Sequence, residues 1–313
     1  MKICGVSDRG WRSTALFILL SVLFLGCRNA PFYRMTSKAS QSLPLRREGI
    51  VAYERGDLRL AEEKFAEALH LNESDVETNR YYGETLWKLG KREEALETLR
   101  NAVGKHGALD AETSLYISIG EKALELGNPN EALVYVERVV SLAPKDVAGW
   151  ELHGHANRAL GNTKEALLDL QRAWHFSLDD REILLEIAAL QLELQDYDSS
   201  LATLQCLERL YPTNHEPAEV FAAKGRAYVG LGYYSDAETA YTIAVRYDPN
   251  SIEYRAELAE TTMLKGNYAE TIAVLDDVQE GMANDPTLQS IRRRATERLE
   301  ELAQIQAESG LLR

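Results

Sequence analysis

The strongest constraint on this chain is a set of positions, mostly glycine, that recurs at nearly constant spacing. We call these positions the turn marks. They are Gly56, Gly90, Gly127, Gly161, Gln195, Gly232 and Gly266. The steps between them are 34, 37, 34, 34, 37 and 34 residues, and glycine or alanine stands seven residues before every mark. Self-similarity at this period predicts a stack of like units rather than one globular core.

The sixth copy of the pattern displays its internal spacing most completely. Small Gly225 stands seven residues before the mark Gly232, and Ala237 and Tyr241 follow it by five and nine residues. Small residues let two helices approach closely, and a large residue fills the space beside them. Gly232 suits a left-handed helix end. Each copy of the pattern is therefore predicted to form a helix, a turn and a second helix.

This pattern resembles the tetratricopeptide repeat, a helix-turn-helix unit of about 34 residues. The resemblance implies an all-α solenoid, curved as a right-handed superhelix. The expected repeats are 42–75, 76–109, 113–146, 147–180, 181–214, 218–251 and 252–285. The fifth departs most from the family, with Ala188, Gln195 and Ser200 where Gly, Gly and Ala are usual. We expect that repeat to open more easily than the sixth.

The repeat pattern stops after residue 285, and one apolar stripe follows. Its members are Leu288, Ile291, Ala295, Leu299 and Leu302. Their spacing fits one face of a helix. The open end of a solenoid needs a cap with a polar outer face. Residues 286–309 are therefore predicted to form a capping helix.

The first residues belong to a different class of sequence. Basic residues precede a 13-residue apolar run, Thr14–Gly26, which is too short to span a bilayer and suits a signal peptide. The run ends in Leu25-Gly26-Cys27, which resembles the lipobox of bacterial lipoproteins. The resemblance implies cleavage after residue 26 and a lipid on Cys27. An ordinary signal peptide or an uncleaved anchor is the alternative.

A lipidated Cys27 would place the chain in the cell envelope, at the outer membrane or on the periplasmic side. The outer membrane is slightly favoured, because Arg28 rather than Asp follows the cysteine. Residues 27–41 show no helical period and are predicted to be a flexible tether. Once Cys4 leaves and Cys27 carries lipid, Cys206 has no cysteine to pair with.

Charge and motifs exclude several classes of function. The formal charge is −14, and an acidic chain lacks the cationic surface that nucleic acids require. No phosphate-binding glycine loop, GxSxG or HExxH occurs. His153 and His155 are two residues apart on a predicted helix and face different sides, so no metal site is expected.

We therefore predict a protein that is not an enzyme, with no cofactor and no small-molecule substrate. The alternative is an enzyme or processing factor with an unrecognised site. Such a site would show as a polar pocket that holds a titratable group with a shifted pKa.

In the tetratricopeptide repeat family, first-helix positions line a concave groove. Carried onto this chain, they are Arg46, Tyr53, Arg80, Glu84, Trp87, Ile117, Glu121, Leu124, Glu151, His155, Arg158, Leu185 and Arg226. Some members clamp a C-terminal carboxylate with a Lys and an Asn four residues apart. Here Arg46 stands with Ile50 and Arg80 with Glu84, so that clamp is absent.

The groove residues predict a protein or peptide partner that is apolar with some Lys or Arg. Trp87 and Tyr53 are the expected anchors, and packing against the next repeat is the alternative for both rings. A scaffold of this kind, tethered to a membrane by its lipid, would serve the assembly or upkeep of a cell-envelope complex.

Overall fold

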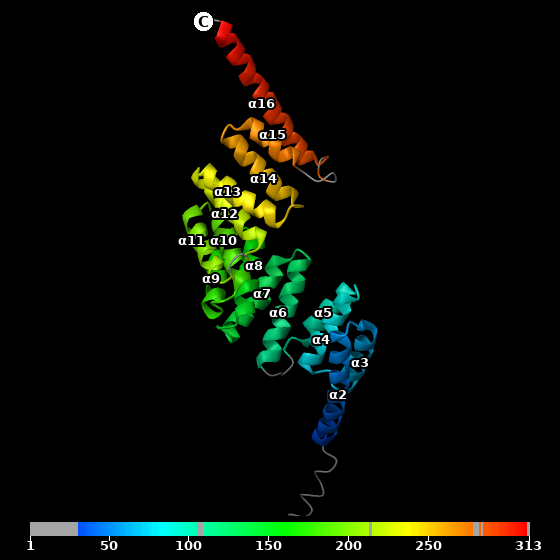
Figure 1. The fold of residues 1–313 in the computed structure, drawn as a ribbon. Helices are drawn as coiled ribbons and strands as arrows, with labels where there is room; N and C mark the ends of the chain where they lie inside the picture. Colours follow the sequence, from blue (N-terminus) through cyan, green and yellow to red (C-terminus); the bar gives the residue numbers. More distant parts are fainter. Residues whose placement is uncertain (1–30, 105–108, 213–214, 278–281, 283, 312–313) are drawn as a thin grey trace, which may run out of the picture. The chain divides into compact units, whose positions relative to one another are not determined.

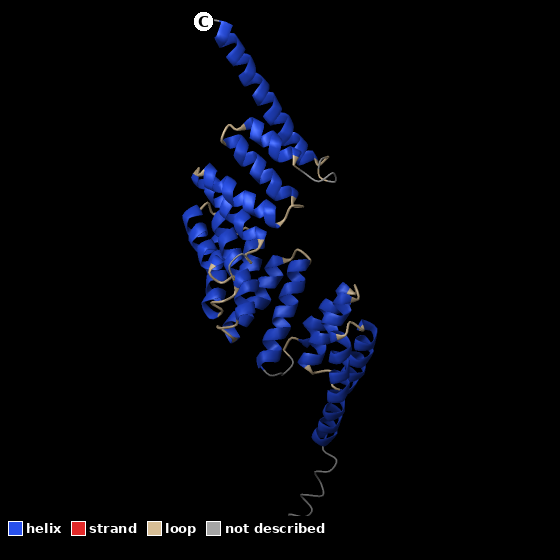
Figure 2. Ribbon diagram, viewed as in Figure 1, coloured by secondary structure: helices blue, strands red, loops and turns tan. Residues whose placement is uncertain are grey.

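The computed structural model describes residues 31–104, 109–212, 215–277, 282 and 284–311. Within these residues every regular element is an α-helix and there is no strand (Figures 1 and 2). The helices are α2 (Pro31–Glu54), α3 (Leu58–Leu71), α4 (Val76–Lys88), α5 (Arg92–Ala102), α6 (Leu109–Glu125), α7 (Pro129–Leu142), α8 (Val147–Ala159), α9 (Thr163–Phe176), α10 (Arg181–Glu193), α11 (Tyr197–Glu208), α12 (Ala218–Leu231), α13 (Tyr234–Tyr247), α14 (Ile252–Leu264), α15 (Tyr268–Asp276) and α16 (Pro286–Leu311). The prediction of an all-α chain of helix pairs is confirmed.

The turn marks end the first helix of each pair. All six glycine marks have φ between 74° and 81°, in the left-handed region. Gln195 takes the same conformation with φ 60°, and it is the one non-glycine residue with positive φ in the described part of the chain. The period read from the sequence is therefore the period of the turns.

The two helices of a repeat approach each other where glycine stands seven residues before the mark. A Cβ atom added to Gly225 would lie 2.6 Å from the ring of Tyr241, which is 2% exposed. The same distance separates an added Cβ on Gly49 from the ring of Phe65. The ring fills the space that the missing side chain leaves.

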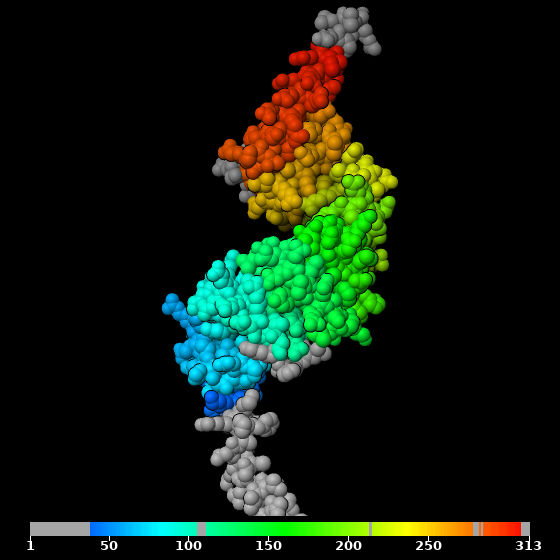
Figure 3. All heavy atoms as spheres, turned by 180° about the vertical axis from the view of Figure 1, so that it is seen from behind, coloured from blue at the N-terminus to red at the C-terminus, as the bar shows by residue number. Residues whose placement is uncertain are grey.

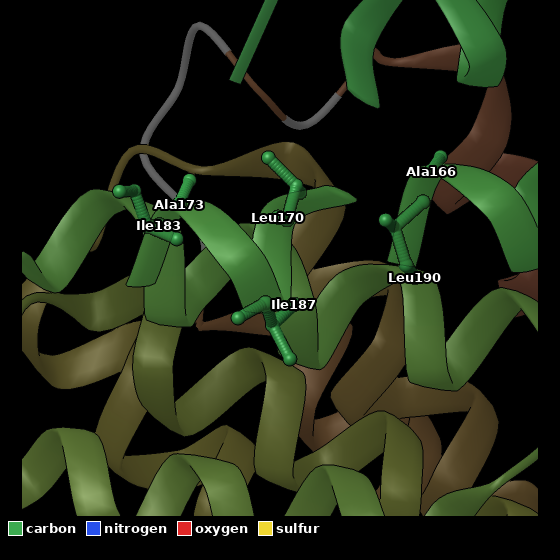
Figure 4. Close-up of a cluster of buried hydrophobic side chains, with 6 residues drawn as sticks. All are labelled: Ala166, Leu170, Ala173, Ile183, Ile187 and Leu190. Carbon is green, nitrogen blue, oxygen red and sulfur yellow. The ribbon is translucent and has the colours of Figure 1, made fainter. Parts of the chain in front are cut away.

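Consecutive repeats pack through the second helix of one and the first helix of the next. Figure 4 shows an example from α9 and α10, where six buried side chains form one cluster. They are Ala166, Leu170, Ala173, Ile183, Ile187 and Leu190. The apolar core thus lies between neighbouring helix pairs as well as within each pair, as expected for a solenoid.

The described helices fall into two compact units, Met1–Lys122 and Ala123–Arg313, which divide within α6. The first has a core around Ala52, Ala61 and Phe65, on α2 and α3. The second contains the clusters from α7 onward, including the one in Figure 4.

The predicted flexible tether is wrong from Pro31 onward, because α2 begins there. Proline suits the first position of a helix, where its missing N–H loses no hydrogen bond and its φ is preset. Ser42 is buried and donates a hydrogen bond of 2.8 Å to the Ala39 carbonyl. The segment lacks an apolar period, and for this reason a helix was not predicted there.

The predicted signal peptide and Cys27 lie outside the described residues. Among the helices that are described, none is both long enough and apolar enough to cross a membrane.

The C-terminal cap is confirmed, with one change. Leu288, Ile291 and Ala295 are buried, and the first two pack with Leu275 of α15. The outward residue Arg293 is exposed and polar. The second half of the predicted stripe is not covered, and its exposed residues are described below.

Candidate functional site

The predicted groove residues stand ten, six or three residues before a turn mark, on the first helices of their repeats. In the first unit they are Arg46, Tyr53, Arg80, Glu84, Trp87, Ile117 and Glu121. In the second unit they are Leu124, Glu151, His155, Arg158, Leu185 and Arg226. All are half-buried except Glu121 and Arg158, which are exposed. Each unit therefore has a surface of these positions, which we call its groove surface.

In the first unit, the groove residue Glu84 bonds to the next first helix. The hydroxyl of Ser118 on α6 donates to Glu84 Oε1. Lys122 Nζ lies 3.1 Å from Glu84 Oε2, and Lys122 is itself buried. Glu84 is thus already engaged within the protein, and it does not await a cation from a partner.

The same link recurs twice in the second unit with other chemistry. His155 Nε2 lies 2.7 Å from Glu186 Oε2, which connects α8 to α10. Arg226 Nε donates to Glu257 Oε1 at 2.6 Å, which connects α12 to α14. In all three links a residue six before one mark bonds a residue nine before the next. The repeat geometry fixes the positions, and the side chains need only be complementary.

The surroundings of His155 and Glu257 shift the pKa values of these two groups. The hydrogen bond to Glu186 raises the pKa of His155 above 6.5. The bond therefore stabilises the fold fully below about pH 6.5, and this contribution is lost as the pH rises through the raised pKa. Burial raises the pKa of Glu257, against the opposing effect of Arg226.

Glu151 differs from the other acidic groove residues. It makes no hydrogen bond or ion pair with the described residues, and burial, with Asp180 as the next cause, raises its pKa. Half-burial of an unpaired carboxyl next to other carboxylates disfavours its charged form.

Two further cationic groove residues, Arg46 and Arg158, are also engaged. Arg46 Nη1 lies 3.0 Å from Asp75 Oδ2 and 2.9 Å from Glu77 Oε2, both at the start of α4. Arg158 donates to Glu193 at the end of α10. These pairs join first helices of consecutive repeats, like the links above.

Both expected aromatic anchors lie under cations. Lys88 Nζ is 4.1 Å from the ring centre of Tyr53, and the Lys122 and Arg92 cations lie 5.6 and 5.4 Å from that of Trp87. Cation–π attraction therefore supports part of each ring. Part of each ring therefore packs against neighbouring residues, which is the alternative role predicted for these aromatics. Both side chains remain half-buried rather than fully covered.

The sequence did not identify the partners of these groove residues. Glu186 and Glu257 each follow their groove partner by 31 residues, one repeat less three positions. Opposite charge or hydrogen-bonding capacity at that separation is the signal that could have found them. The sequence predicted the groove positions. It did not show that their polar side chains bond to side chains on the first helix of the next repeat.

A metal site finds no support in the described residues. No group of three His, Cys, Asp or Glu residues there could hold a metal ion. His153 Nδ1 instead lies 2.6 Å from Asp169 Oδ2, which also accepts from Asn157 at 2.8 Å. This cluster joins α8 to α9 and satisfies a buried carboxylate. Cys206 is a free, half-buried thiol.

The family profile described as tetratricopeptide repeat matches residues 46–112 and 222–287. Among solved structures, the C-terminal part of a TPR repeat-containing protein from Cytophaga hutchinsonii is 15% identical, with a TM-score of 0.64, over 81% of this chain and 98% of that chain. PilF from Pseudomonas aeruginosa is 16% identical, with a TM-score of 0.60, over 72% and 99%.

YrrB, described as a TPR protein with an unusual peptide-binding site, is 19% identical, with a TM-score of 0.51, over 62% of this chain and 97% of that chain. No match was found among curated proteins. Identities this low show a shared fold and nothing finer. With the profile match and the repeated helix pairs, they identify the chain as an all-α tetratricopeptide repeat solenoid.

Proposed function

We propose that this chain is a non-enzymatic scaffold, tethered to a membrane through Cys27, which binds a protein or peptide partner on its groove surfaces. It would act on the outer side of the cell envelope, in the assembly or upkeep of an envelope complex. The proposal rests on a tetratricopeptide repeat fold and on the lipobox-like sequence before Cys27.

One observation supports the groove surfaces as the site. Their polar residues are mostly bonded within the protein, whereas their apolar residues stay partly accessible. Tyr53, Trp87 and Ile117 in the first unit are half-buried, as are Leu124 and Leu185 in the second. Partly exposed aromatic and aliphatic side chains between satisfied polar groups are typical of sites where a few residues dominate binding energy.

The bonded state of these polar groups also limits the chemistry expected of the partner. Glu84 already holds Lys122, so it offers little to a partner's cation. We therefore propose an apolar peptide segment, recognised as a helix or extended strand that places side chains against Trp87 and Tyr53. YrrB offers a structural parallel for peptide binding on this fold.

The tether is supported by the sequence before α2. The helix begins at Pro31, four residues after Cys27. Four residues span at most about 14 Å, so a lipidated Cys27 would hold α2 close to the bilayer. Two or three acyl chains anchor a protein firmly, whereas a single chain does so weakly.

The tether is tested by mass spectrometry of the amino-terminal peptide and by fractionation. Wild-type protein should carry lipid on Cys27 and sediment with membranes, whereas Cys27→Ser should keep its precursor length and lose the lipid. An unmodified Cys27 in the membrane-bound protein would contradict the tether.

The partner surface is tested by cross-linking and affinity purification of the lipidated chain from its native membrane. Trp87→Ala should weaken capture of the partner by about 2 kcal/mol, roughly thirtyfold in Kd. Phe176→Ala is the matched control, because it removes an aromatic ring that is exposed on a second helix. Circular dichroism should be unchanged in both. If binding survives Trp87→Ala combined with Glu121→Lys, the partner binds elsewhere.

A further inference from the structure

The position five residues before each turn mark shows where the solenoid lacks a neighbour. In the second to seventh repeats this residue is buried, at 0–6% exposure; the six are Thr85, Lys122, Ala156, Leu190, Ala227 and Thr261. Leu190 belongs to the buried cluster in Figure 4, with Ala166, Leu170 and Ala173 of α9, the second helix of the preceding repeat. In the first repeat the same position is Val51, and it is 42% exposed. Among the described residues no helix precedes α2 to cover it.

A groove surrounds Val51 on the outer side of α2 and α3. Val51, Ala52 and Leu60 form its apolar part, and Arg47, Arg55 and Lys64 lie along it with Glu48 and Asp57. We call it the end groove. Arg47 and Arg55 stand four residues before and after Val51, and neither makes a hydrogen bond or ion pair through its side chain in the described part of the chain. The end groove is therefore an apolar strip between two unpaired cations.

The other end of the chain carries an exposed apolar stripe on α16. Leu299, Leu302 and Ile305 are 39%, 43% and 60% exposed. We call these three residues the α16 stripe. They continue the face on which Leu288 and Ile291 are buried. In Figures 1 and 3 this half of the helix runs past α15.

The register of α16 explains why its stripe has no cover. The helix begins 34 residues after α14, where the first helix of an eighth repeat would begin. Residue 300 would then be the turn mark, but the helix continues through it to Leu311. Arg293 stands seven residues before that mark, where the other repeats have the glycine or alanine that packs on a second helix, whereas the stripe is apolar. The stripe is thus a helical face left without a partner by the missing turn.

We propose that the α16 stripe of one copy of this chain occupies the end groove of a second copy. The groove lacks a second helix, and the C-terminal half of α16 is an amphipathic helix with an uncovered apolar face. Between residues 297 and 307, α16 carries exposed Glu297, Glu300 and Glu301 against one cation, Arg298, which pairs with Glu301. This excess of negative charge complements Arg47 and Arg55 of the end groove. An amphipathic helix in an apolar groove is a recurring mode of recognition.

The contact joins two different surfaces, so it is head-to-tail and leaves a free groove and a free stripe on every pair. Larger assemblies should therefore form as the protein concentration rises. A single helix of this length buries less surface than stable dimers use, so the association should be reversible. It involves neither Cys27 nor the groove surfaces, and it stands apart from the proposed function.

The test is sedimentation velocity of the full chain in a fixed concentration of mild detergent, over a wide range of protein concentration. The mean mass of the wild type should rise past that of a dimer. Val51→Glu and Leu302→Glu should each remain monomeric, because each places a carboxylate at the centre of one surface. Leu168→Glu is the matched control: Leu168 is exposed on the second helix α9, and the variant should associate like the wild type.

Mixing the two variants makes the test specific. Val51→Glu keeps an intact stripe and Leu302→Glu keeps an intact groove, so an equimolar mixture should form dimers and nothing larger. A wild type that is monomeric at every concentration would overturn the proposal, as would a mixture that stays monomeric. If the monomeric wild type instead binds phosphatidylglycerol vesicles and Val51→Glu does not, a lipid surface covers the groove and the proposal is wrong.

Discussion

The fifth and sixth repeats reach the same helix pairing with different chemistry. In the sixth, Gly225 lies against the ring of Tyr241 and Gly232 forms the left-handed turn. In the fifth, α10 and α11 pair although Ala188 replaces the first glycine, and the Ser200 hydroxyl donates to the Ala188 carbonyl at 3.0 Å. Ala188 and Ser200 are both fully buried. The comparison teaches that the repeat requires small residues and a left-handed turn at fixed positions, and not particular residue types.

The fifth repeat has one feature without compensation. Gln195 adopts the left-handed conformation in place of Gly232. A side chain in that conformation costs about 1–2 kcal/mol, because Cβ approaches the following carbonyl oxygen. We therefore locate the weakness expected of this repeat at its turn rather than in its packing, and the predictions below test that distinction.

The largest effects should come from the large residue nine positions after each mark. Tyr241→Ala should cost about 3–5 kcal/mol of unfolding free energy and Leu204→Ala about 2–5 kcal/mol. Tyr241→Ala should be the more harmful, because it removes more volume and Gly225 has no side chain to fill the cavity. Urea denaturation followed by circular dichroism measures both. A larger loss for Leu204→Ala would mean that the two repeats are not packed alike.

Exchange of the small residues seven positions before the marks should harm both repeats. Gly225→Ala should destabilise by about 1–3 kcal/mol, because the new Cβ overlaps the ring of Tyr241. Ala188→Gly should cost about 1 kcal/mol through lower helix propensity. The same denaturation assay applies. A neutral Gly225→Ala would show that the ring can move and that the close approach is not required.

The buried hydroxyl of the fifth repeat should make a moderate contribution. Ser200→Ala removes its hydrogen bond to Ala188 and should cost about 1 kcal/mol. Ala237 stands in the same relation to Gly225 as Ser200 does to Ala188, twelve residues apart. Ala237→Ser should then be nearly neutral in urea denaturation, since the equivalent carbonyl can accept. A strongly destabilised Ala237→Ser would confine this bond to the fifth repeat.

The smallest effect should come from the turn, and it should have the opposite sign. Gln195→Gly should stabilise by about 0.5–1 kcal/mol, since relief of the left-handed strain outweighs the extra freedom of the unfolded chain. Hydrogen exchange should show lower protection in α10 and α11 than in α12 and α13, and Gln195→Gly should reduce the difference. Gly232→Gln is the matched reverse change. Equal protection of the two helix pairs in the wild type would contradict a weak fifth repeat.

Part of the groove was predictable and part was not. The positions of Glu84, His155 and Arg226 follow from the period, because each stands six residues before a turn mark. Their partners lie on the next first helix, and the sequence shows no local pattern that joins them. Which side chains meet depends on how consecutive helices pack, and that is a tertiary property.

The sequence by itself determined the all-α architecture and the positions of the turns, because small residues and left-handed turns must recur wherever two helices approach closely. It also placed Gln195 at a turn, where its φ of 60° is now observed. Only the tertiary structure decided that α2 begins at Pro31, that Glu84 holds Lys122, and that Leu302 of the capping helix is uncovered. The last two depend on a neighbour distant in sequence or on its absence, because burial in a solenoid is set by the next repeat.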